Sequence, residues 1–353
     1  MKSAVYYAKT ANKDIKEQLA ALERVLAAAN PFSMYTADEL VPVKITVGDS
    51  QCVYHVRPEL VRTVIGLLKE KKTRPFLFDT NVIYKGERTN AVDHMMLAVS
   101  KGFGPTKVHA PFIVADGLLG QDGKEYRLEG GHISTVRVPS FVGMLESLVV
   151  LSHVTGHIAS GYAGALKNVA MGMACRPTKQ VQHSSLKPHV ISAKCTACGA
   201  CLRICPAAAI SWKDSRAAIE PSKCVGCAEC LCACKFYAIF LNWHEDTDIF
   251  CQRMVEVAEF ILAKFKRKFY INFALDITKE CDCISTKDEE IIAHDIGILA
   301  SDDPVALDKA TYDLANKDGD VFVKAQGRGE YHGMLEYAAK RNVGSLEYEL
   351  VNV

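Results

Sequence analysis

The sequence predicts an α/β protein whose mostly parallel sheet with covering helices is interrupted by a small, separate module. Two observations indicate this fold class. Stretches with helical spacing alternate with short apolar and β-branched runs, both before residue 190 and after residue 242. Between these positions the alternation stops, and closely spaced cysteines take its place. We therefore expect a larger α/β domain formed by residues 1–190 and 242–353, with residues 191–241 inserted as a second domain.

The first part of the larger domain reads as helices and strands in alternation. Helices are expected where apolar residues recur every three or four positions, and strands where short apolar runs stand between turn residues. The expected helices are 13–29, 58–71 and 90–101, and the expected strands are 41–47, 75–79, 108–116 and 147–154. Glycines and charges in residues 117–131 indicate a loop or hairpin at an edge of the sheet.

The same alternation resumes after the inserted segment. Helices are expected at 246–266 and 304–316, and strands at 270–276 and 295–300. Asp302 and Asp303 precede Pro304. An acid at the N-cap followed by proline in the first turn is typical of a helix start, so we interpret these residues as structural.

Composition and charge exclude several classes of function. The 353 residues include 49% hydrophobic and 24% charged residues and carry a formal net charge of +1, without a basic stripe that would bind nucleic acid. Charges interrupt residues 1–22 too often for a signal peptide, and no apolar run is long enough to span a membrane. We expect a cytoplasmic protein. Fourteen cysteines in a reducing compartment then indicate metal or redox chemistry rather than disulfides.

Two runs of four cysteines repeat one spacing inside the inserted segment. Each run has the pattern C-x2-C-x2-C-x3-C, and the runs are Cys195, Cys198, Cys201 and Cys205, then Cys224, Cys227, Cys230 and Cys234. This duplication resembles the bacterial two-cluster ferredoxins over residues 194–239, which implies a small α+β domain with two four-iron, four-sulfur (4Fe-4S) clusters. Structural zinc is the alternative, but zinc sites seldom include the third cysteine of such a run.

The ferredoxin resemblance also implies which cysteines share a cluster. In that family the fourth cysteine of each run binds the cluster of the other run. Carried over, one cluster is held by Cys195, Cys198, Cys201 and Cys234, and the other by Cys224, Cys227, Cys230 and Cys205. A unit this small has little apolar core, so metal binding is expected to supply much of its folding free energy.

Around the inserted segment, the chain resembles the iron-sulfur centre proteins of domain-of-unknown-function family 362. The resemblance rests on PFLFDTNVIYKGERTNAVDH at 75–94, IVADGLLG at 113–120, SHVTGHIASGYAGALKNVAMGMACR at 152–176, ECDC at 280–283 and DIGILASDDPVALDKA at 295–310. It covers nearly the whole chain but implies no particular activity.

His157, Lys167 and His183 also follow a recognisable spacing, with glycines between the first two. This stretch locally resembles the active-site segment of the nickel-pincer lactate racemases. The resemblance implies that His157 is an acid/base, Lys167 bears a pyridinium cofactor and His183 binds nickel. Asp49, with Ser50 after it, is similar to the start of that family's Asp-x-Thr-Arg motif. Asn81 stands where the second catalytic histidine is expected, so a symmetrical two-histidine racemisation is not predicted.

The residues themselves also indicate a site. Glycines before Lys167 would let backbone N–H groups approach an anion near the start of a helix, and we interpret Asp49, Lys167 and Asn168 as candidate cofactor-binding residues. Ordinary polar residues with satisfied hydrogen bonds are the alternative for His157, Lys167 and His183.

Cys281 and Cys283 form a further candidate pair. They would face the same side of an extended strand and, with His183, could bind a second metal; a dithiol redox pair or inert buried cysteines are alternatives. Cys175 is a candidate third member of this group.

The leading hypothesis is an iron-sulfur oxidoreductase that transfers electrons through two 4Fe-4S clusters to or from a site in the larger domain. That site would hold a substrate, an organic cofactor or a second metal. Alternatives are an electron carrier or complex subunit without its own catalysis, and a metal or cofactor assembly or sensing protein. Expected partners are a redox protein or a small-molecule electron donor or acceptor, with no nucleic acid and no membrane. The sequence does not indicate the oligomeric state.

Overall fold

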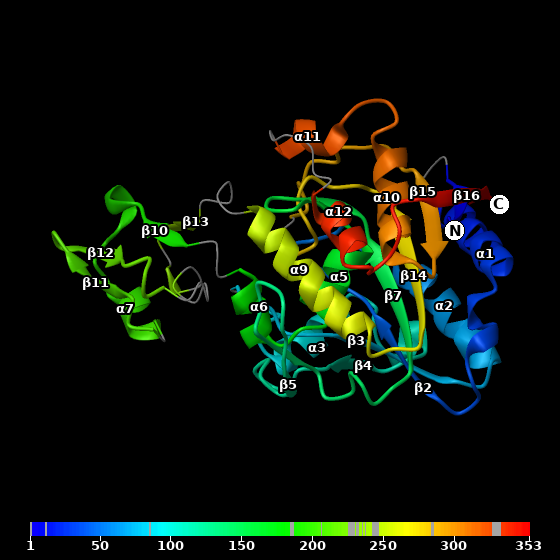
Figure 1. Ribbon diagram of the computed structural model, residues 1–353, viewed down its shortest axis with the longest axis horizontal. Helices are drawn as coiled ribbons and strands as arrows, with labels where there is room; N and C mark the ends of the chain where they lie inside the picture. Colours follow the sequence, from blue (N-terminus) through cyan, green and yellow to red (C-terminus); the bar gives the residue numbers. More distant parts are fainter. Residues whose placement is uncertain are drawn as a thin grey trace.

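A large sheet with helices on both of its faces forms most of the molecule, and a smaller module stands at one end (Figure 1). The computed structural model describes residues 2–10, 13–84, 86–183, 187–205, 207–224, 230, 233–234, 236, 238–241, 247–283, 286–326 and 333–353. No helix within these ranges is long and apolar enough to cross a membrane.

The central sheet has eight strands and is mostly parallel, as the sequence predicts. From one edge to the other its strands are β16 (Tyr348–Asn352), β1 (Ser3–Lys9), β15 (Gly297–Ser301), β14 (Arg267–Ala274), β7 (Ser147–His153), β2 (Leu40–Lys44), β3 (Arg74–Asp79) and β4 (Phe112–Val114). Strand β15 pairs antiparallel with both β1 and β14, whereas the other neighbours pair parallel. The carboxyl ends of β14, β7, β2, β3 and β4 therefore meet at one end of the sheet.

Helices cover both faces of this sheet. One face packs against α1 (Ile15–Ala29), α2 (Pro58–Glu70) and α3 (Ala91–Ser100). The other packs against α5 (Ala165–Gly172), α9 (Thr247–Leu262), α10 (Pro304–Ala315) and α12 (Gly333–Lys340). Shorter helices are η1 (Pro31–Met34), α4 (Pro105–Val108), α6 (Arg176–Gln182) and α11 (Val321–Gln326).

Strand β7 shows why the central strands read as continuous apolar runs. Leu148 and Val150 pack into the core on one face, whereas Val149 and Leu151 pack into the core on the opposite face. Successive side chains of a strand point to opposite faces, so a strand buried on both faces needs an apolar residue at nearly every position. The sequence therefore locates this strand well.

Several elements differ from the sequence-based expectations. Strand β4 is much shorter than expected, because residue 108 still belongs to helix α4, bends follow it at 109–110, and a turn begins at residue 115. The expected edge hairpin exists as β5 (Lys124–Arg127) and β6 (Thr135–Val138), but it forms its own two-stranded sheet. Strands β1 and β16 were not predicted. Asp303 is confirmed as the N-cap of α10, because its side chain accepts hydrogen bonds from Val305 N and Ala306 N.

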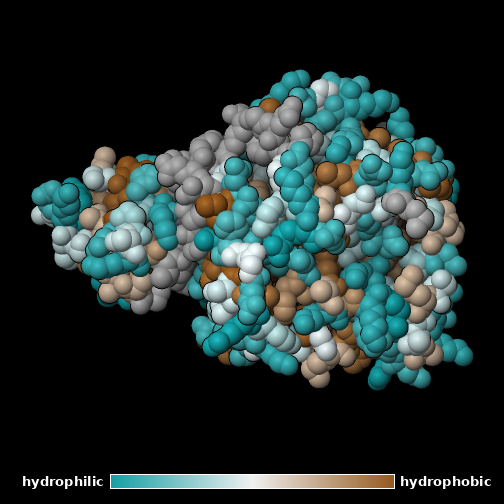
Figure 2. Space-filling view, viewed as in Figure 1, coloured by the Kyte–Doolittle hydropathy of each residue, from teal (hydrophilic) through white to brown (hydrophobic). Residues whose placement is uncertain are grey.

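The cysteine-rich module is built on two short antiparallel ribbons. Strand β10 (Pro188–Val190) pairs with β13 (Ile239–Leu241), and β11 (Ile210–Lys213) pairs with β12 (Arg216–Ile219). Turn η2 (Ser192–Lys194) and helix α7 (Ala200–Ile204) lie between them in sequence. Apolar side chains show at its surface in Figure 2, and Trp212 and Phe236 are about half exposed.

Candidate functional site

A cavity of about 240 Å³ opens in the larger domain where parallel strands end. Thr46 follows β2, Asp79 ends β3 and His153 ends β7, and all three line this cavity. Ligands of open α/β sheets bind in the crevice beyond the carboxyl ends of the strands. The position of the cavity is therefore the one expected for a binding or catalytic site.

The cavity brings together most of the residues that the sequence nominated. His157 reaches it from β8 (Thr155–His157), which pairs with β9 (Gly161–Ala163). The other nominated residues in its wall are Lys167 and Asn168 on α5, His183 at the end of α6, and Cys281 and Cys283 after β14. Segments far apart in the sequence therefore contribute to one site.

His157 is held in a defined tautomer. Its Nδ1 accepts hydrogen bonds from Ala159 N at 3.2 Å and Ser160 N at 3.0 Å. A nitrogen that accepts two N–H groups carries no hydrogen, so the neutral ring has its proton on Nε2. The ring stacks on Phe250, with 6.1 Å between centroids. His157 is thus arranged to donate a hydrogen bond through Nε2, and a proton added at Nδ1 would face two amide hydrogens.

His183 has the opposite arrangement. Its Nδ1 lies 2.7 Å from the carbonyl oxygen of Lys179, and because a carbonyl only accepts, Nδ1 carries the proton. Nε2 then keeps its lone pair. Burial lowers the pKa of His183 to about 4, so the ring is neutral at pH 7. A neutral histidine whose Nδ1–H is fixed by a carbonyl is the usual form of a metal ligand.

Asn168 holds α5 in place through its amide group. Its Oδ1 accepts from Lys44 Nζ at 2.7 Å and Thr46 Oγ1 at 3.2 Å, and its Nδ2 donates to Leu151 O and Ser152 Oγ. Both amide atoms therefore have protein partners, and the side chain fixes the helix that carries Lys167 against the strand ends.

The expected anion site at the start of α5 is already filled by the protein. The buried carboxylate of Asp308, on α10, accepts hydrogen bonds from Ala165 N at 2.8 Å and Leu166 N at 2.9 Å. Burial raises the pKa of Asp308 to about 6. The expectation that these amides bind an external anion is therefore wrong, because a carboxylate of the chain itself satisfies them.

Cys281 and Cys283 lie in a turn rather than on the expected extended strand. Asp282, which a strand would direct to the other side, lines the same cavity. The Cys281 thiol donates a hydrogen bond to Cys283, and Lys167 Nζ lies 3.7 Å from Cys283 Sγ. This hydrogen bond, together with the charges of Lys167 and Arg88, lowers the pKa of Cys283 well below its ordinary value despite burial. The same contact and burial raise the pKa of Cys281.

A buried ion pair positions this turn. His153 Nδ1 lies 2.6 Å from Asp282 Oδ1, and its Nε2 lies 2.8 Å from the carbonyl oxygen of Leu275. Both ring nitrogens face oxygen acceptors, so the ring carries two protons. Burial alone would lower the pKa of His153, but the carboxylate of Asp282 raises it overall. The end of β7 is thereby tied to the turn that holds both thiols.

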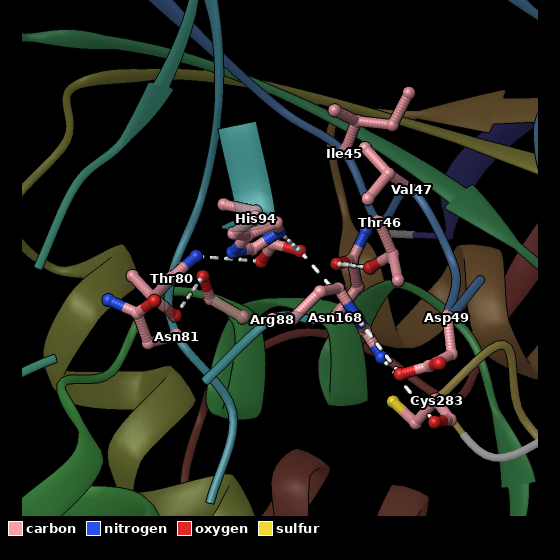
Figure 3. Close-up of polar contacts among 12 residues, drawn as sticks. Ile45, Thr46, Val47, Asp49, Thr80, Asn81, Arg88, His94, Asn168 and Cys283 are labelled. Atoms are coloured by element: carbon pink, nitrogen blue, oxygen red, sulfur yellow. Dashed lines mark hydrogen bonds and ion pairs between the residues drawn. The ribbon is translucent and has the colours of Figure 1, made fainter. Parts of the chain in front are cut away.

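A charged network that the sequence did not indicate lies at the cavity (Figure 3). Asp79 lies 3.1 Å from Lys44 Nζ and 3.9 Å from an Arg88 nitrogen, and all three side chains are buried. Arg88 also donates to Tyr84 Oη at 2.9 Å and to the carbonyl oxygen of Cys283 at 3.5 Å. Asp79 ends a parallel strand within the family segment 75–94, which is the signal that could have identified it.

Two nominated residues lie outside the cavity wall. Asp49 accepts a hydrogen bond from Ser50 N. Its Oδ2 lies 4.0 Å from Arg88 Nε, so Asp49 forms an ion pair with a residue of the cavity wall. Cys175 contacts the carbonyl oxygen of Asp122 at 3.6 Å and does not line the cavity. The expectation that Cys175 joins the pair is therefore wrong. Within the described ranges, no three His, Cys, Asp or Glu side chains converge closely enough to hold a metal ion.

The module places cysteines from both runs around a small second cavity. Its wall includes Cys195, Cys198, Cys201 and Cys234. Cys205 and Cys230 belong to the same small core or pack against it. Cys224 is half-buried, and Lys187 Nζ donates to its carbonyl oxygen at 2.6 Å. Cys227 lies outside the described residues.

Fold and site together define a mixed α/β protein with a buried, charged cavity at the carboxyl ends of parallel strands. The sequence matches the family described as "Domain of unknown function (DUF362)" over residues 41–313, and the chain therefore belongs to that family. No curated protein gives a significant match.

Solved structures similar to this chain include a lactate racemase apoprotein and a structural-genomics protein. The lactate racemase apoprotein from Thermoanaerobacterium thermosaccharolyticum is 13% identical with a TM-score of 0.43, covering 92% of this chain and 58% of its own. A structural-genomics protein from Thermotoga maritima is 9% identical with a TM-score of 0.48, covering 95% of this chain and 61% of its own. The chain thus spans about six tenths of the length of either protein.

Proposed function

We propose that this protein is an iron-sulfur redox protein that holds two 4Fe-4S clusters in residues 191–241 and exchanges electrons with the cavity of the larger domain. One observation carries the proposal: Cys195, Cys198 and Cys201 of the first run line one cavity together with Cys234 of the second run. This is the ligand set that cross-ligation between two runs requires. The four thiols are also a donor set that suits iron-sulfur clusters or zinc.

Equivalent contacts in the two runs support a duplicated site. Ala209 N donates to Cys205 Sγ at 3.3 Å, and Ala238 N donates to Cys234 Sγ at 3.3 Å. In each run the sulfur of the fourth cysteine thus accepts an amide hydrogen from the fourth residue beyond it. Such hydrogen bonds stabilise thiolate ligands and tune the reduction potential of a cluster. Bound clusters of this type would supply one-electron transfer.

The first cluster site is close to the protein surface. Cys198 is exposed, and the half-exposed Trp212 and Phe236 contribute to the wall of the same cavity. An exposed edge lets an external redox protein or small electron donor approach the ligands, and these are the partners we propose. A reducing cytoplasm, which keeps thiols reduced, is the compartment we propose for a protein with eight cysteine ligands.

The connection to the larger domain is short. His183 lines the large cavity and Val190 lines the small one, and the chain advances only seven residues between them. Their Cα atoms are therefore at most about 25 Å apart. The returning strand β13 ends nine positions before Phe250, which lies in the wall of the large cavity. This proximity supports electron exchange within one chain.

An electron carrier without its own catalysis is the second candidate. The cavity favours a protein with its own reactive site over a pure electron carrier. It gathers two thiols, Lys167 and two histidines of fixed tautomer, and such clusters of perturbed groups are typical of reactive sites. Roles for His157, Lys167 and His183 in catalysis or cofactor binding belong to this proposal. An assembly or sensing function has no feature of its own in the described residues.

Anaerobic purification followed by metal and sulfide analysis tests the proposal. We expect about eight irons and eight acid-labile sulfides per chain. Cys234→Ser should disturb the cluster of Cys195, whereas Cys205→Ser should disturb the other, as judged by paramagnetic resonance of the reduced protein. Cys251→Ser, on α9 in the larger domain, is the matched control and should keep both clusters. Zinc in place of iron, or only four irons, would contradict the proposal.

A further inference from the structure

The turn at Cys281 and Cys283 has a geometry suited to reversible disulfide formation. Cα atoms two positions apart on an extended strand are about 6.6–7.2 Å apart, at or beyond the usual disulfide span of roughly 4.4–6.8 Å. These residues lie in a turn, which shortens that separation, and both thiols line one cavity. A disulfide across a single intervening residue is strained, and strained disulfides are the readily reduced, catalytic ones.

The surroundings of Cys283 favour an attacking thiolate. Lys167 Nζ lies 3.7 Å from its sulfur, and the hydroxyl of Tyr84 donates a hydrogen bond to it. Tyr84 in turn accepts from Arg88 at 2.9 Å. Cys281, which donates to Cys283, is placed as the second thiol. The Cys283 sulfur is thus placed to attack a disulfide substrate. Cys281 is placed to attack the mixed disulfide that this would form on Cys283.

The cavity wall also indicates the class of substrate. Cationic side chains outnumber anionic groups there: Arg88, His153, Lys167 and Lys179 stand against Asp79, Asp282 and the Cys283 thiolate. Lys179 donates to Thr80 Oγ1 at 2.6 Å and to the carbonyl oxygen of Asn81, both neutral groups. Apolar residues such as Val82, Met171 and Phe250 form another part of the wall. A small molecule with an apolar body and an anionic group fits this combination.

We propose that Cys281 and Cys283 form a dithiol–disulfide couple that reduces a small organic disulfide bearing an anionic group. The inference rests on the proposed function, because electrons reach the couple through the cluster module. It assigns the acceptor in the larger domain and the chemical class of its substrate.

The reaction balances in three steps. The Cys283 thiolate attacks one sulfur of the substrate, so that a mixed disulfide forms, the substrate S–S bond breaks and the other half leaves as a thiolate that takes a proton from solvent. Cys281 then loses its proton and attacks the Cys283 sulfur, which forms the internal disulfide and releases the second half as a thiol. Two electrons, delivered singly through the module from an external one-electron donor, and two protons restore the dithiol.

The test uses full-length, cluster-loaded protein without oxygen and the dicarboxylated reagent 5,5′-dithiobis(2-nitrobenzoate). Wild-type protein should release both halves of the reagent and end with a Cys281–Cys283 disulfide and no adduct. Cys281→Ser should release one half and retain the other on Cys283. Cys283→Ser should react at least about tenfold more slowly, because the thiolate is lost. Cys251→Ser is the matched control, since it removes a half-buried cysteine outside the cavity, and should behave as wild type.

A comparison of reagents tests the charge preference. The rate with the dicarboxylate should fall as salt is added, whereas the rate with neutral 4,4′-dithiodipyridine should change little. Equal salt dependence for both reagents would overturn the anionic class. Peptide mapping of wild-type protein gives a result even if a variant does not fold: separate adducts on Cys281 and Cys283, or no reaction at either, overturn the couple.

Iron and sulfide are measured on the same samples, so that the two proposals fail separately. Full clusters without an internal disulfide would overturn the dithiol couple and leave the proposed function standing. An internal disulfide in protein that holds no clusters after anaerobic reconstitution would overturn the proposed function and the electron route through the module.

Discussion

The cysteine-rich module and the larger domain differ in how much apolar core they bury. The buried core of the described part of the module consists of Cys201, Ile210, Ala217, Cys230 and Ile239, of which two are predicted cluster ligands. The larger domain instead buries an extensive apolar core on each face of its sheet. A core as small as that of the module contributes little free energy of folding, and in the function proposed above the two clusters would supply most of it. Removing a cluster and removing a core side chain should therefore affect different parts of the chain.

The largest expected effect comes from removing iron. Chelation should abolish protection from hydrogen exchange throughout the module, because its ligands would lose the metal that joins the two runs. Strands β7 and β14 of the larger domain should keep their protection, since their side chains are buried by apolar packing. Hydrogen exchange followed by mass spectrometry measures both regions in one sample, and anaerobic reconstitution is the control. Full protection of the module without metal would contradict the comparison.

The second prediction removes an apolar side chain from the core of the larger domain and leaves the module unchanged. Phe78 in β3 is fully buried and packs against Phe76 and Phe141 at ring-centroid distances of 6.2 and 5.0 Å. Phe78→Ala should destabilise the larger domain by about 3–5 kcal/mol through the cavity it leaves, without changing the iron content. Urea unfolding followed by circular dichroism measures this loss.

The matched control for Phe78 is a phenylalanine of the module. Phe240 in β13 is 44% exposed. Phe240→Ala should change the unfolding free energy of the larger domain by less than about 0.5 kcal/mol. A large loss of iron from Phe78→Ala would show that the two regions depend on each other more than the comparison assumes.

The third prediction concerns pH and has the smallest effect. The pKa of Asp308 is raised by burial from 3.8 to about 6, so between these values the folded state binds more protons than the unfolded state. Stability therefore falls as pH rises through this window. Between pH 5 and 7 the loss from this group should be about 1 kcal/mol, and Asp308→Asn should remove it.

A neutral change on the same helix provides the control for Asp308. Thr311 contacts the same Asn272 amide that donates to Asp308. Thr311→Val should destabilise the larger domain equally at pH 5 and pH 7, because it removes no titrating group. The slope of urea unfolding free energy against pH distinguishes the two variants, and an unchanged slope in Asp308→Asn would contradict the assignment.

The sequence predicts the central strands and their order of occurrence better than the edges of the sheet. Strand β7 is apolar at nearly every position because it is buried on both faces, and local composition shows this directly. Strands β1 and β16 pair with one another across almost the whole length of the chain, as the register Ser3 to Tyr348 shows. No local pattern records a partner that distant, so these strands could not be inferred from sequence.

The candidate site shows the same division between local and distant information. His157, Lys167 and His183 were nominated because they lie in one segment, and the structure places all three in the cavity wall. The charged residues that surround them come from the ends of other strands and loops, as Asp79 and Arg88 do. The carboxylate that accepts hydrogen bonds from the first amides of α5 belongs to Asp308 on α10. This contact depends on how α10 packs against α5, and residue spacing along the chain does not reveal it.

The contact of Asp308 with the start of α5 also has a consequence for the order of events during synthesis. Asp308 follows Ala165 by 143 positions, so the helix that carries Lys167 waits for α10 before its first amides are satisfied. All eight cysteines of the two runs lie between Cys195 and Cys234 and leave the ribosome well before Asp308 does. In the proposed function, iron could therefore be loaded onto a nascent chain whose cavity has not yet formed, and the cavity would become complete only after the clusters that supply its electrons.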